Sequence, residues 1–377
     1  MPNKKYLQKA VLAVIALVFL GGSILFFNPV HNQRALTAQD LRLDDQEATI
    51  RAIKKVKPAV VSIVVYDYGS VLEVETGKNK LDLAKKRLEK QRGTGFIVSA
   101  NGYILTNKHV LFGVNRKSAE YRVILNSGKE YYAQFIAEDP VFDLAVLKIF
   151  DKNLPVAELG DSGKLEEGAT VLAIGNALGR YENSVTKGIV SGLGRSVVAS
   201  DGANNTEQLD NVIQVDAKIN HGNSGGPLLD LYGRVVGINT AIEEAGSSIG
   251  FAIPINDAKI VIDSIVKSGK IKRPYLGVSY IMLTPQDAID NGLARQNGAW
   301  ITADKDGGEK ALIAGSPAEK AGLAEGDIIF EVNAIKIEGK NTLLSVIQKF
   351  QPGKKIGLKI QRGDKILVKT VELGEMK

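Results

Sequence analysis

A serine flanked by glycines is the strongest chemical signal in the sequence. Ser224 lies in the run 222–227, which reads GNSGGP. A nucleophilic serine needs an accessible hydroxyl and backbone N–H groups directed at the developing oxyanion. Glycines on both sides allow the tight backbone path that such a site requires. The pattern therefore favours a nucleophile, with a plain glycine-rich hairpin turn as the alternative.

A nucleophilic serine also needs a base, and the chain has three histidines, His31, His109 and His221. His31 lies beside an apolar N-terminal segment. His221 lies three residues before Ser224, so it could reach the serine only through the backbone that should form the oxyanion hole. His109 ends the strand-like run YILTNKHV. We therefore predict that His109 is the base, although a lone histidine at a strand end is more often structural.

The third member of such a site is a carboxylate that orients the imidazole. Asp143, in the run 139–147 (DPVFDLAVL), is an acidic residue with apolar neighbours on both sides. A carboxylate buried there is costly unless it is paired or hydrogen-bonded, for example by an imidazole. Asp143 is the predicted partner of His109, and an Asp that caps the turn before a strand is the alternative.

Composition narrows the classes of protein to consider. A length of 377 residues suggests two domains, and 44% apolar with 24% charged residues is typical of a globular protein. The 39 glycines favour many tight turns and thus a β-rich fold. Cysteine is absent, which excludes a thiol nucleophile, a disulfide framework and a thiolate metal site.

Charge and motifs argue against nucleic acid and ATP as ligands. The formal net charge is only +6, and no recognised nucleic-acid-binding module is present. The sequence also contains no phosphate-binding Gly-Lys-Ser/Thr loop. We predict no cofactor, no metal and no nucleic-acid partner. The densest basic stretch, 78–92, is expected to be a solvated insertion, or alternatively a patch facing lipid or a partner.

The N-terminus carries an apolar run of about 18 residues at 10–27, just enough to cross a bilayer as a helix. Lysines precede it, which predicts a cytoplasmic N-terminus at 1–9. A cleavable signal peptide is the rival interpretation, but its apolar core is usually shorter and no clear cleavage site follows. Residues 28–48 are polar and are expected to be a linker.

The elements that must position the site are short strands. From Ala59 onward, alternating or apolar runs end in Asn-Gly and Ser-Gly turns, as in antiparallel sheets. Their number over about 200 residues predicts a barrel or a sandwich. Residues 255–269 have helical spacing with Gly269 as the stop, and a second unit begins at Arg273.

Three segments, TNKHV, DPVFDLAVLK and NHGNSGGPL, resemble the HtrA family of trypsin-like serine proteases over about residues 50–270. The resemblance implies a mainly β fold of two six-stranded β-barrels with the site between them. It implies attack by Ser224, proton transfer by His109, orientation by Asp143, and an oxyanion hole from the N–H groups of Gly222 and Ser224. The predicted protease domain spans 49–270.

The resemblance also implies a substrate pocket. Its predicted lining is shallow and apolar, suited to Val, Ala or similar residues, and comprises Ile219, Ile249, Gly250, Phe251 and Ala252. In trypsin-like enzymes that cut after Lys or Arg, a carboxylate lies six residues before the serine. Lys218 has this position here, which argues against cleavage after basic residues and is unusual for the family.

The C-terminal unit, 271–377, resembles a PDZ domain. Tyr275, Leu276, Gly277 and Val278 match the loop whose backbone N–H groups hold a peptide carboxylate. The runs 315–323 and 326–329 are typical of bacterial PDZ domains, and 342–350 is the expected helix beside the peptide groove. In the protease domain, 192–208 matches the regulatory sensor loop of the family, and Arg195 the arginine that helps to order the oxyanion loop.

These features together predict a membrane-anchored, ATP-independent serine endopeptidase that cleaves unfolded or misfolded envelope proteins and binds peptide C-termini. It would be a single-pass protein of the cytoplasmic membrane with its catalytic domain in the periplasm or at the cell surface. The family also suggests a homotrimer. General quality control under stress and regulated signalling cleavage both stay open, and the alternative is an inactive PDZ adaptor or holdase.

Overall fold

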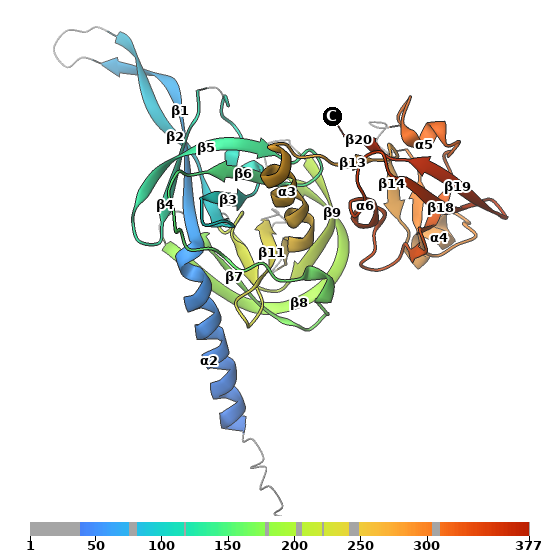
Figure 1. The fold of residues 1–377 in the computed structure, drawn as a ribbon, viewed down its shortest axis with the longest axis horizontal. Coiled ribbons are helices and arrows are strands. Elements are labelled where there is room, and N and C mark those ends of the chain that lie inside the picture. The colour runs from blue at the N-terminus through green and yellow to red at the C-terminus, as the bar shows by residue number, and fades with distance from the viewer. Residues whose placement is uncertain are drawn as a thin grey trace, which may run out of the picture. The chain divides into compact units, whose positions relative to one another are not determined.

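The computed structural model describes residues 38–74, 81–116, 118–177, 181–200, 206–220, 222–240, 249–303 and 310–376. It is a mainly β protein, as predicted, with two closed barrels followed by a smaller sheet (Figure 1). The predicted anchor at 10–27 and cytoplasmic segment at 1–9 lie outside the described residues. Among the helices of the described part, none is long and apolar enough to cross a membrane.

The first barrel has six antiparallel strands in the spatial order β1-β2-β3-β6-β5-β4. Alternating side chains such as Ile63, Ile104 and Leu147 fill its interior, as expected for small closed barrels. The strands are β1 (Val60–Val74), β2 (Leu81–Ile97), β3 (Tyr103–Thr106), β4 (Glu120–Leu125), β5 (Glu130–Glu138) and β6 (Ala145–Lys148).

The second barrel repeats this arrangement in the order β10-β11-β12-β9-β8-β7. A one-turn 3-10 helix, η3 (Ser162–Lys164), precedes it, and Asp161 caps that turn by accepting a hydrogen bond from the Gly163 N–H. The strands are β7 (Thr170–Ala177), β8 (Tyr181–Ser200), β9 (Thr206–Val215), β10 (Pro227–Leu229), β11 (Val235–Thr240) and β12 (Gly250–Pro254).

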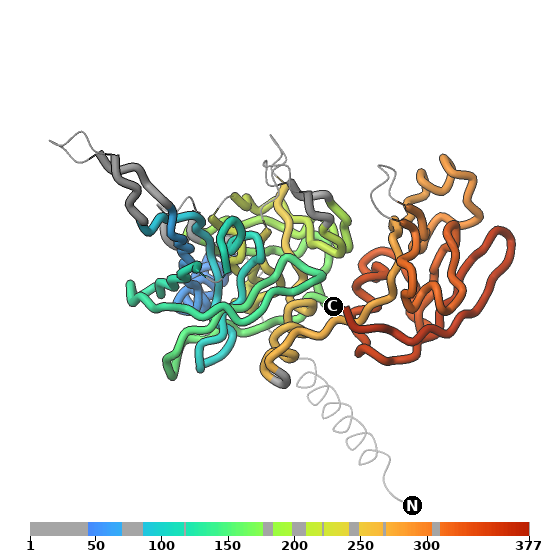
Figure 2. Tube along the Cα trace, turned by 90° about the horizontal axis from the view of Figure 1, so that it is seen from above, coloured from blue at the N-terminus to red at the C-terminus, as the bar shows by residue number. Residues whose placement is uncertain are grey.

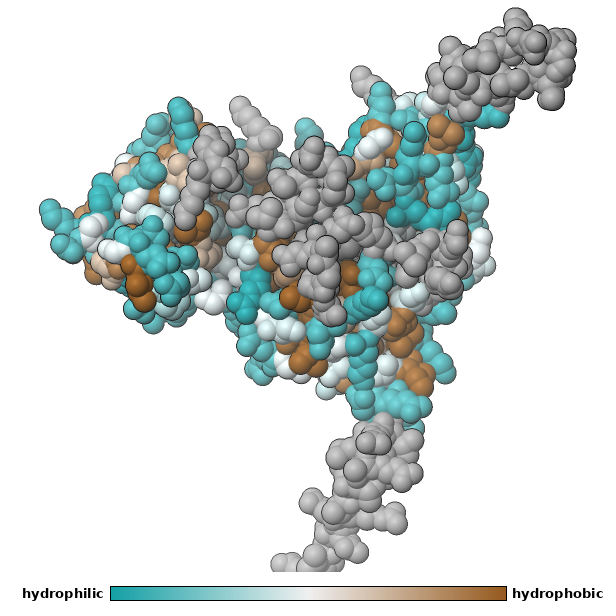
Figure 3. Space-filling view, turned by 180° about the vertical axis from the view of Figure 1, so that it is seen from behind, coloured by the Kyte–Doolittle hydropathy of each residue, from teal (hydrophilic) through white to brown (hydrophobic). Residues whose placement is uncertain are grey.

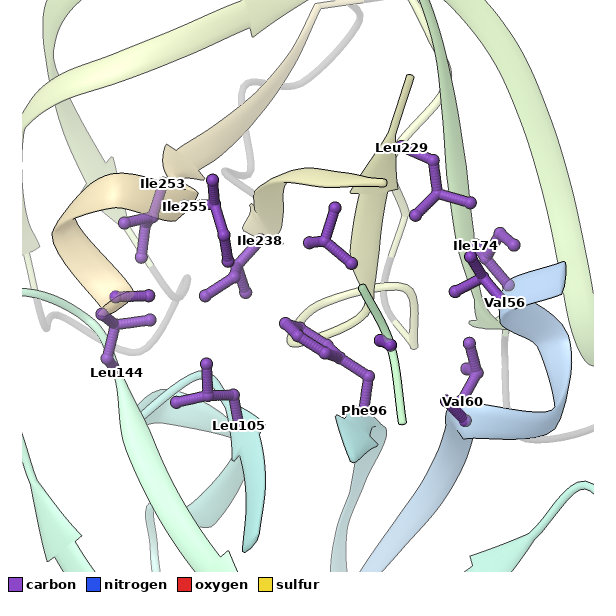
Figure 4. Close-up of a cluster of buried hydrophobic side chains, with 14 of the residues drawn as sticks. Val56, Val60, Phe96, Leu105, Leu144, Ile174, Leu229, Ile238, Ile253 and Ile255 are labelled. Carbon is purple, nitrogen blue, oxygen red and sulfur yellow. The ribbon is translucent and has the colours of Figure 1, made fainter. Parts of the chain in front are cut away.

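A shared apolar core joins the two barrels (Figure 4). Phe96 and Leu105 come from the first barrel, and Ile174 and Ile238 from the second. Buried apolar area contributes about 25 cal/mol per Å² to the stability of such an interface. The barrels are therefore held against each other by packing, which fixes the loops that meet between them.

Helix α2 (Ala38–Val56) begins inside 28–48, the segment expected to be a linker, so that segment is helical from Ala38 onward. Ala52 and Val56 are buried in the core shared by the barrels. Apolar residues spaced four apart anchor one helix face, and this tertiary packing extends a helix into a sequence that looks merely polar. The short helix η1 (Lys57–Ala59) then leads into β1.

Two polar segments form paired strands, and only the second differs from expectation, which was a loop. The basic stretch is largely strand, because β2 pairs with β1 from Leu81 to Phe96 as a two-stranded ribbon that continues past β4. Most of 192–208 is also strand rather than loop, since β8 pairs with β9 up to Ser200 opposite Thr206. Both are long hairpins whose cross-strand pairing overrides their polar composition.

Helix α3 (Ile255–Ser268) follows the second barrel and ends as predicted at Gly269, whose φ is +68°. A left-handed residue at this position is a common helix end, and glycine adopts it without strain. Ala258 and Ile265 pack this helix into the core shared by the barrels.

The C-terminal unit, orange to red in Figure 2, is built around a sheet in the order β14-β15-β16-β18-β19, with β17 paired to β16 and β13 paired to β20. Its strands are β13 (Pro274–Tyr275), β14 (Tyr280–Met282), β15 (Ala299–Ile301), β16 (Ile328–Val332), β17 (Ile335–Lys336), β18 (Lys355–Arg362), β19 (Lys365–Glu372) and β20 (Gly374–Glu375). Its helices are α4 (Pro285–Asp290), α5 (Pro317–Lys320) and α6 (Leu343–Ile347).

The expected groove helix at 342–350 is therefore present but shorter. Thr342 caps α6 through a hydrogen bond from the Ser345 N–H, as N-terminal threonines commonly do. On the exterior, Figure 3 shows apolar residues interspersed among hydrophilic ones on the face it displays. Scattered apolar side chains are ordinary for a protein surface.

Candidate active site

His109 and Asp143 meet in the first barrel. His109 begins the 3-10 turn η2 (His109–Leu111) just after β3, and Asp143 lies in the connection between β5 and β6. The His109 Nδ1 atom is 2.6 Å from Asp143 Oδ2, and the His109 backbone N–H donates to Asp143 Oδ1 at 2.9 Å. Both carboxylate oxygens thus bind the same residue, which fixes the ring. A proton on Nδ1 would leave Nε2 as the acceptor.

The Asp143 carboxylate is 1% exposed and is held by further polar groups. Thr240, at the end of β11 in the second barrel, donates its hydroxyl to Asp143 Oδ2 at 3.3 Å. The Asn107 side chain donates to the Asp143 carbonyl at 2.8 Å. The bonds from His109 and Thr240 to the carboxylate oxygens offset the cost of burying that group, whereas the Asn107 bond holds the backbone of Asp143. Neither Thr240 nor Asn107 was a sequence candidate, because a lone polar residue at a strand end carries no pattern.

Ser224 is 4% exposed and lies in the loop 222–226 that leads into β10. Backbone hydrogen bonds connect the C-terminal end of this loop to β11. The Gly225 N–H donates to the Asn239 carbonyl, and the Asn239 N–H donates to the Gly226 carbonyl. Thr94 in β2 binds the near end. Its N–H donates to the Ser224 carbonyl at 3.0 Å, and its hydroxyl donates to the Gly222 carbonyl at 2.6 Å.

The loop also needs its glycines. Gly222 has φ +102°, and the Asn223 N–H donates to the Asn220 carbonyl at 3.0 Å, which closes a turn. A positive φ of this size is a conformation that glycine adopts without strain. Gly225 has φ +81°, and a Cβ there would lie 2.2 Å from the Thr94 carbonyl oxygen. His221 lies outside the described residues.

The predicted pocket residues are only partly brought together. A Cβ on Gly250 would lie 2.9 Å from Ile219 Cδ1, so these two residues are in contact, and Ala252 belongs to the same apolar cluster as Ile219. Ile249 is 41% exposed beside them. Phe251 was expected in this lining, but its side chain packs with Leu209 and Val212 in a different cluster, because successive side chains of a strand point to opposite faces. The neighbouring Lys218 side chain is exposed.

The predicted carboxylate-binding loop lines a groove of about 260 Å³ that is formed mostly by the C-terminal unit, with Val141 from the β5–β6 connection also in its lining. Gly277 has φ +84°, and a Cβ there would lie 2.3 Å from the Ser316 side chain. Only glycine tolerates both conditions. The groove is largely apolar, and its lining includes Tyr275, Leu276, Gly277, Val278, Ile313, Leu343 and Ile347. Burial raises the pKa of the Tyr275 phenol above its ordinary value.

Arg195 lies in β8, opposite Val212 of β9, and its side chain is exposed. The position of a Cβ on Gly192 would be 2.6 Å from Arg195 Nε, so the arginine folds back over that glycine. Three register shifts interrupt the β8–β9 pairing between Val190 and Val197. Bulges of this kind re-aim side chains and weaken local pairing. Within the described ranges, no group of three His, Asp or Glu side chains is placed to hold a metal ion.

Family models match both parts of the chain. A trypsin-like peptidase domain matches residues 93–238, and a PDZ domain matches residues 274–373. Among solved structures, the chain is similar to "HtrA-type protease AlgW with decapeptide", with a TM-score of 0.65 and 34% identity over 87% of this chain and 99% of that one. It is also similar to the serine endoprotease from Yersinia pestis, with a TM-score of 0.55 and 28% identity over 87% and 98% of the two chains.

Curated sequences give the same result. The chain is 36% identical to "Putative serine protease HhoB" of Synechocystis over 343 residues, which are 88% of this chain and 80% of that protein. It is 41% identical to "Probable periplasmic serine endoprotease DegP-like" of Marinomonas over 276 residues, which are 72% and 55% of the two chains. The match thus spans about half the length of this DegP-like relative.

Proposed function

Because this chain belongs to the HtrA family of trypsin-like serine proteases, we propose that it cleaves peptide bonds with Ser224 as nucleophile, His109 as base and Asp143 as the orienting carboxylate. The observation that carries this proposal is a pair of hydrogen bonds between one histidine and one carboxylate. Asp143 accepts one from Nδ1 and one from the backbone N–H of His109. A histidine with a purely structural role at a strand end would not need a buried carboxylate bound to both its ring nitrogen and its backbone N–H.

The proposed reaction is that of the serine-protease template. His109 Nε2 takes the proton as Ser224 Oγ attacks the carbonyl carbon of the substrate, and Asp143 stays ionised and stabilises the imidazolium. The N–H groups of Gly222 and Ser224 bind the resulting oxyanion. His109 then protonates the departing amine, and a water molecule that it deprotonates releases the acyl group from Ser224.

The proposed substrates are unfolded or misfolded proteins of the cell envelope. With no ATP-binding loop in its sequence, the enzyme would act on segments that are already extended. The apolar run at 10–27 would anchor it in the cytoplasmic membrane with the protease domain (49–270) outside the cytoplasm. The printed name of the Marinomonas relative supports a periplasmic site. Membership of the HtrA family supports a homotrimer.

The PDZ domain (271–377) would bind peptide C-termini and regulate the protease. Backbone N–H groups of 275–278 would hold the carboxylate while the peptide adds a strand at β14. Tyr280 in β14 donates its hydroxyl to Asp210 in β9 at 3.3 Å and accepts from the Leu344 N–H at 3.2 Å. This half-buried phenol offers a direct route from the groove to the hairpin that carries Arg195.

Peptide-dependent activation of the full-length enzyme tests this regulation. Wild type should cleave an unfolded substrate faster when a peptide with an apolar C-terminus is added, whereas Arg195→Ala and Tyr280→Phe should respond less. Equal rates in all three proteins, with and without peptide, would reduce the PDZ domain to a tether for substrate.

Two roles follow for such an enzyme, general quality control and regulated cleavage of one membrane-bound signalling substrate. Digestion of a loosely folded model protein separates them, since many fragments favour quality control. Labelling of Ser224 by a fluorophosphonate, a reagent that modifies activated serines, tests the enzymatic function itself. A chain that neither reacts with this reagent nor cleaves any unfolded protein would be the adaptor or holdase instead.

A further inference from the structure

We propose that Thr94 is a positioning residue for catalysis, which holds the oxyanion-binding loop in its working shape from the opposite barrel. The inference rests on the proposed role of Ser224 as nucleophile. Thr94 lies in β2 of the first barrel and is fully buried. It touches no substrate position, so any effect on the reaction passes through the loop 222–226.

Thr94 binds the two residues whose N–H groups would form the oxyanion hole. Its hydroxyl donates to the carbonyl of Gly222 at 2.6 Å, and its N–H donates to the carbonyl of Ser224 at 3.0 Å. Within one residue, the N–H and the C=O directions are related only by φ and ψ. Fixing both carbonyls therefore restricts the directions in which both N–H groups can point.

Thr94 is itself held rigidly. The hydroxyl of Thr106 in β3 donates to the Thr94 carbonyl at 2.7 Å. The hydroxyl and the backbone N–H of Thr94 thus both donate to the loop, while its carbonyl accepts a bond from its own barrel. His109 comes just after the same strand β3. Strand β3 therefore positions both the base and Thr94, the residue that supports the nucleophile loop.

The loop also packs against Thr94 without spare room. A Cβ on Gly225 would lie 2.2 Å from the Thr94 carbonyl oxygen, and a Cβ on Gly226 would lie 3.0 Å from Thr94 Cγ2. The two glycines after the serine let the loop come this close. A loop that merely connected two strands would not need contacts of this kind at both ends of the nucleophile.

The hydroxyl is the part of Thr94 that a substitution can remove cleanly. Thr94→Val keeps the branched shape and the backbone bond to Ser224 but loses the bond to Gly222. Loss of a whole oxyanion donor costs about 10²–10³ in kcat. Loss of one of two restraints on the loop should cost less, and we expect kcat to fall by roughly 10- to 100-fold with KM nearly unchanged.

The test compares three full-length variants for kcat, KM and inhibition by a peptide aldehyde, which mimics the tetrahedral intermediate. Thr94→Val should lose turnover and bind the aldehyde more weakly by a similar factor, because both depend on the oxyanion hole. Thr94→Ser keeps the hydroxyl and should retain most activity. Ile97→Val is the matched control, since it removes one buried methylene from the same strand and should leave both measurements unchanged.

Several outcomes would overturn the proposal. They are full turnover in Thr94→Val, an equal loss in Thr94→Ser, or an equal loss in Ile97→Val, which would reveal a general effect of stability. If Thr94→Val melts below the assay temperature, Thr94→Cys, whose thiol is a weak donor, should show an intermediate loss. Ser224→Ala, measured alongside, distinguishes failure of this inference from failure of the proposed nucleophile, since only the latter leaves Ser224→Ala active.

Discussion

Removal of a buried negative charge from helix α3 should stabilise this protein at neutral pH. Asp257 lies in the first turn of α3 and accepts a hydrogen bond from the Asn211 side chain at 2.9 Å. Burial raises the pKa of its carboxyl from 3.8 to about 6. The Asn211 bond and the Arg273 charge lower the pKa in part, Asp139 raises it, and Lys349 lowers it.

The size and sign of the effect follow from proton linkage. Between about pH 4 and pH 6 the folded chain holds a proton on Asp257 that the unfolded chain releases, so stability falls as the pH rises through this window. At about 1.4 kcal/mol per pKa unit, ionised Asp257 costs on the order of 3 kcal/mol above pH 6. Asp257→Asn mimics the neutral form and should recover much of this free energy at pH 7.5, but little at pH 4.

Thermal and urea unfolding at pH 4, 5, 6 and 7.5 measure this difference. Asp263→Asn is the matched control, because it removes the same charge from the exposed face of the same helix and should change the free energy of unfolding little at any pH. The reasoning would be refuted if Asp257→Asn were less stable than wild type at pH 7.5. It would also be refuted if the substitution changed the free energy of unfolding equally at pH 4 and pH 7.5.

The remaining predictions concern the site and the anchor. His109→Ala should lower kcat on an unfolded protein by roughly 10⁴- to 10⁶-fold, whereas His221→Ala should cost far less; the reverse result would mean that His221 is the base. Ile219→Ala should enlarge the pocket beside Gly250 and shift cleavage toward larger apolar residues, as mapped by mass spectrometry of the fragments, and an unchanged map would remove Ile219 from the pocket. The intact chain should stay with membranes in high salt, because an apolar run of about 18 residues spans rather than adsorbs; release by salt would overturn the anchor.

The strands and Asp143 could be predicted from the sequence because their signals are local, whereas the two barrels were implied only by the resemblance to the HtrA family. Alternating runs between turn residues indicate strands wherever they occur, and Asp143 stands out because its neighbours are apolar on both sides. The end of α3 was equally readable, since Gly269 comes three residues after Val266, the last apolar residue of the helix. Such features depend on a few adjacent residues, which a sequence displays directly.

Other features depend on residues that are distant in the chain and could not be predicted. Helix α2 packs into the core between the barrels through Ala52 and Val56, a contact that its polar sequence does not reveal. Phe251 was placed in the pocket by resemblance to the family, but its side chain packs with Leu209 and Val212 in a different cluster. Thr94 binds a loop 128 residues further along the chain, and nothing in the stretch around it marks that contact.

The central claim is that Ser224 is the nucleophile of a serine protease, and cleavage of an unfolded protein by the purified chain tests it most directly. Ser224→Ala should lower the rate by on the order of 10⁶, while the melting temperature and the fluorescence response of Trp300, the single tryptophan, to a C-terminal peptide stay as in wild type. Trp300 pairs with Ile281 of β14, the strand at which the peptide would be added, so its fluorescence reports on that strand. Cleavage at the wild-type rate by Ser224→Ala, in a preparation free of other proteases, would contradict the account.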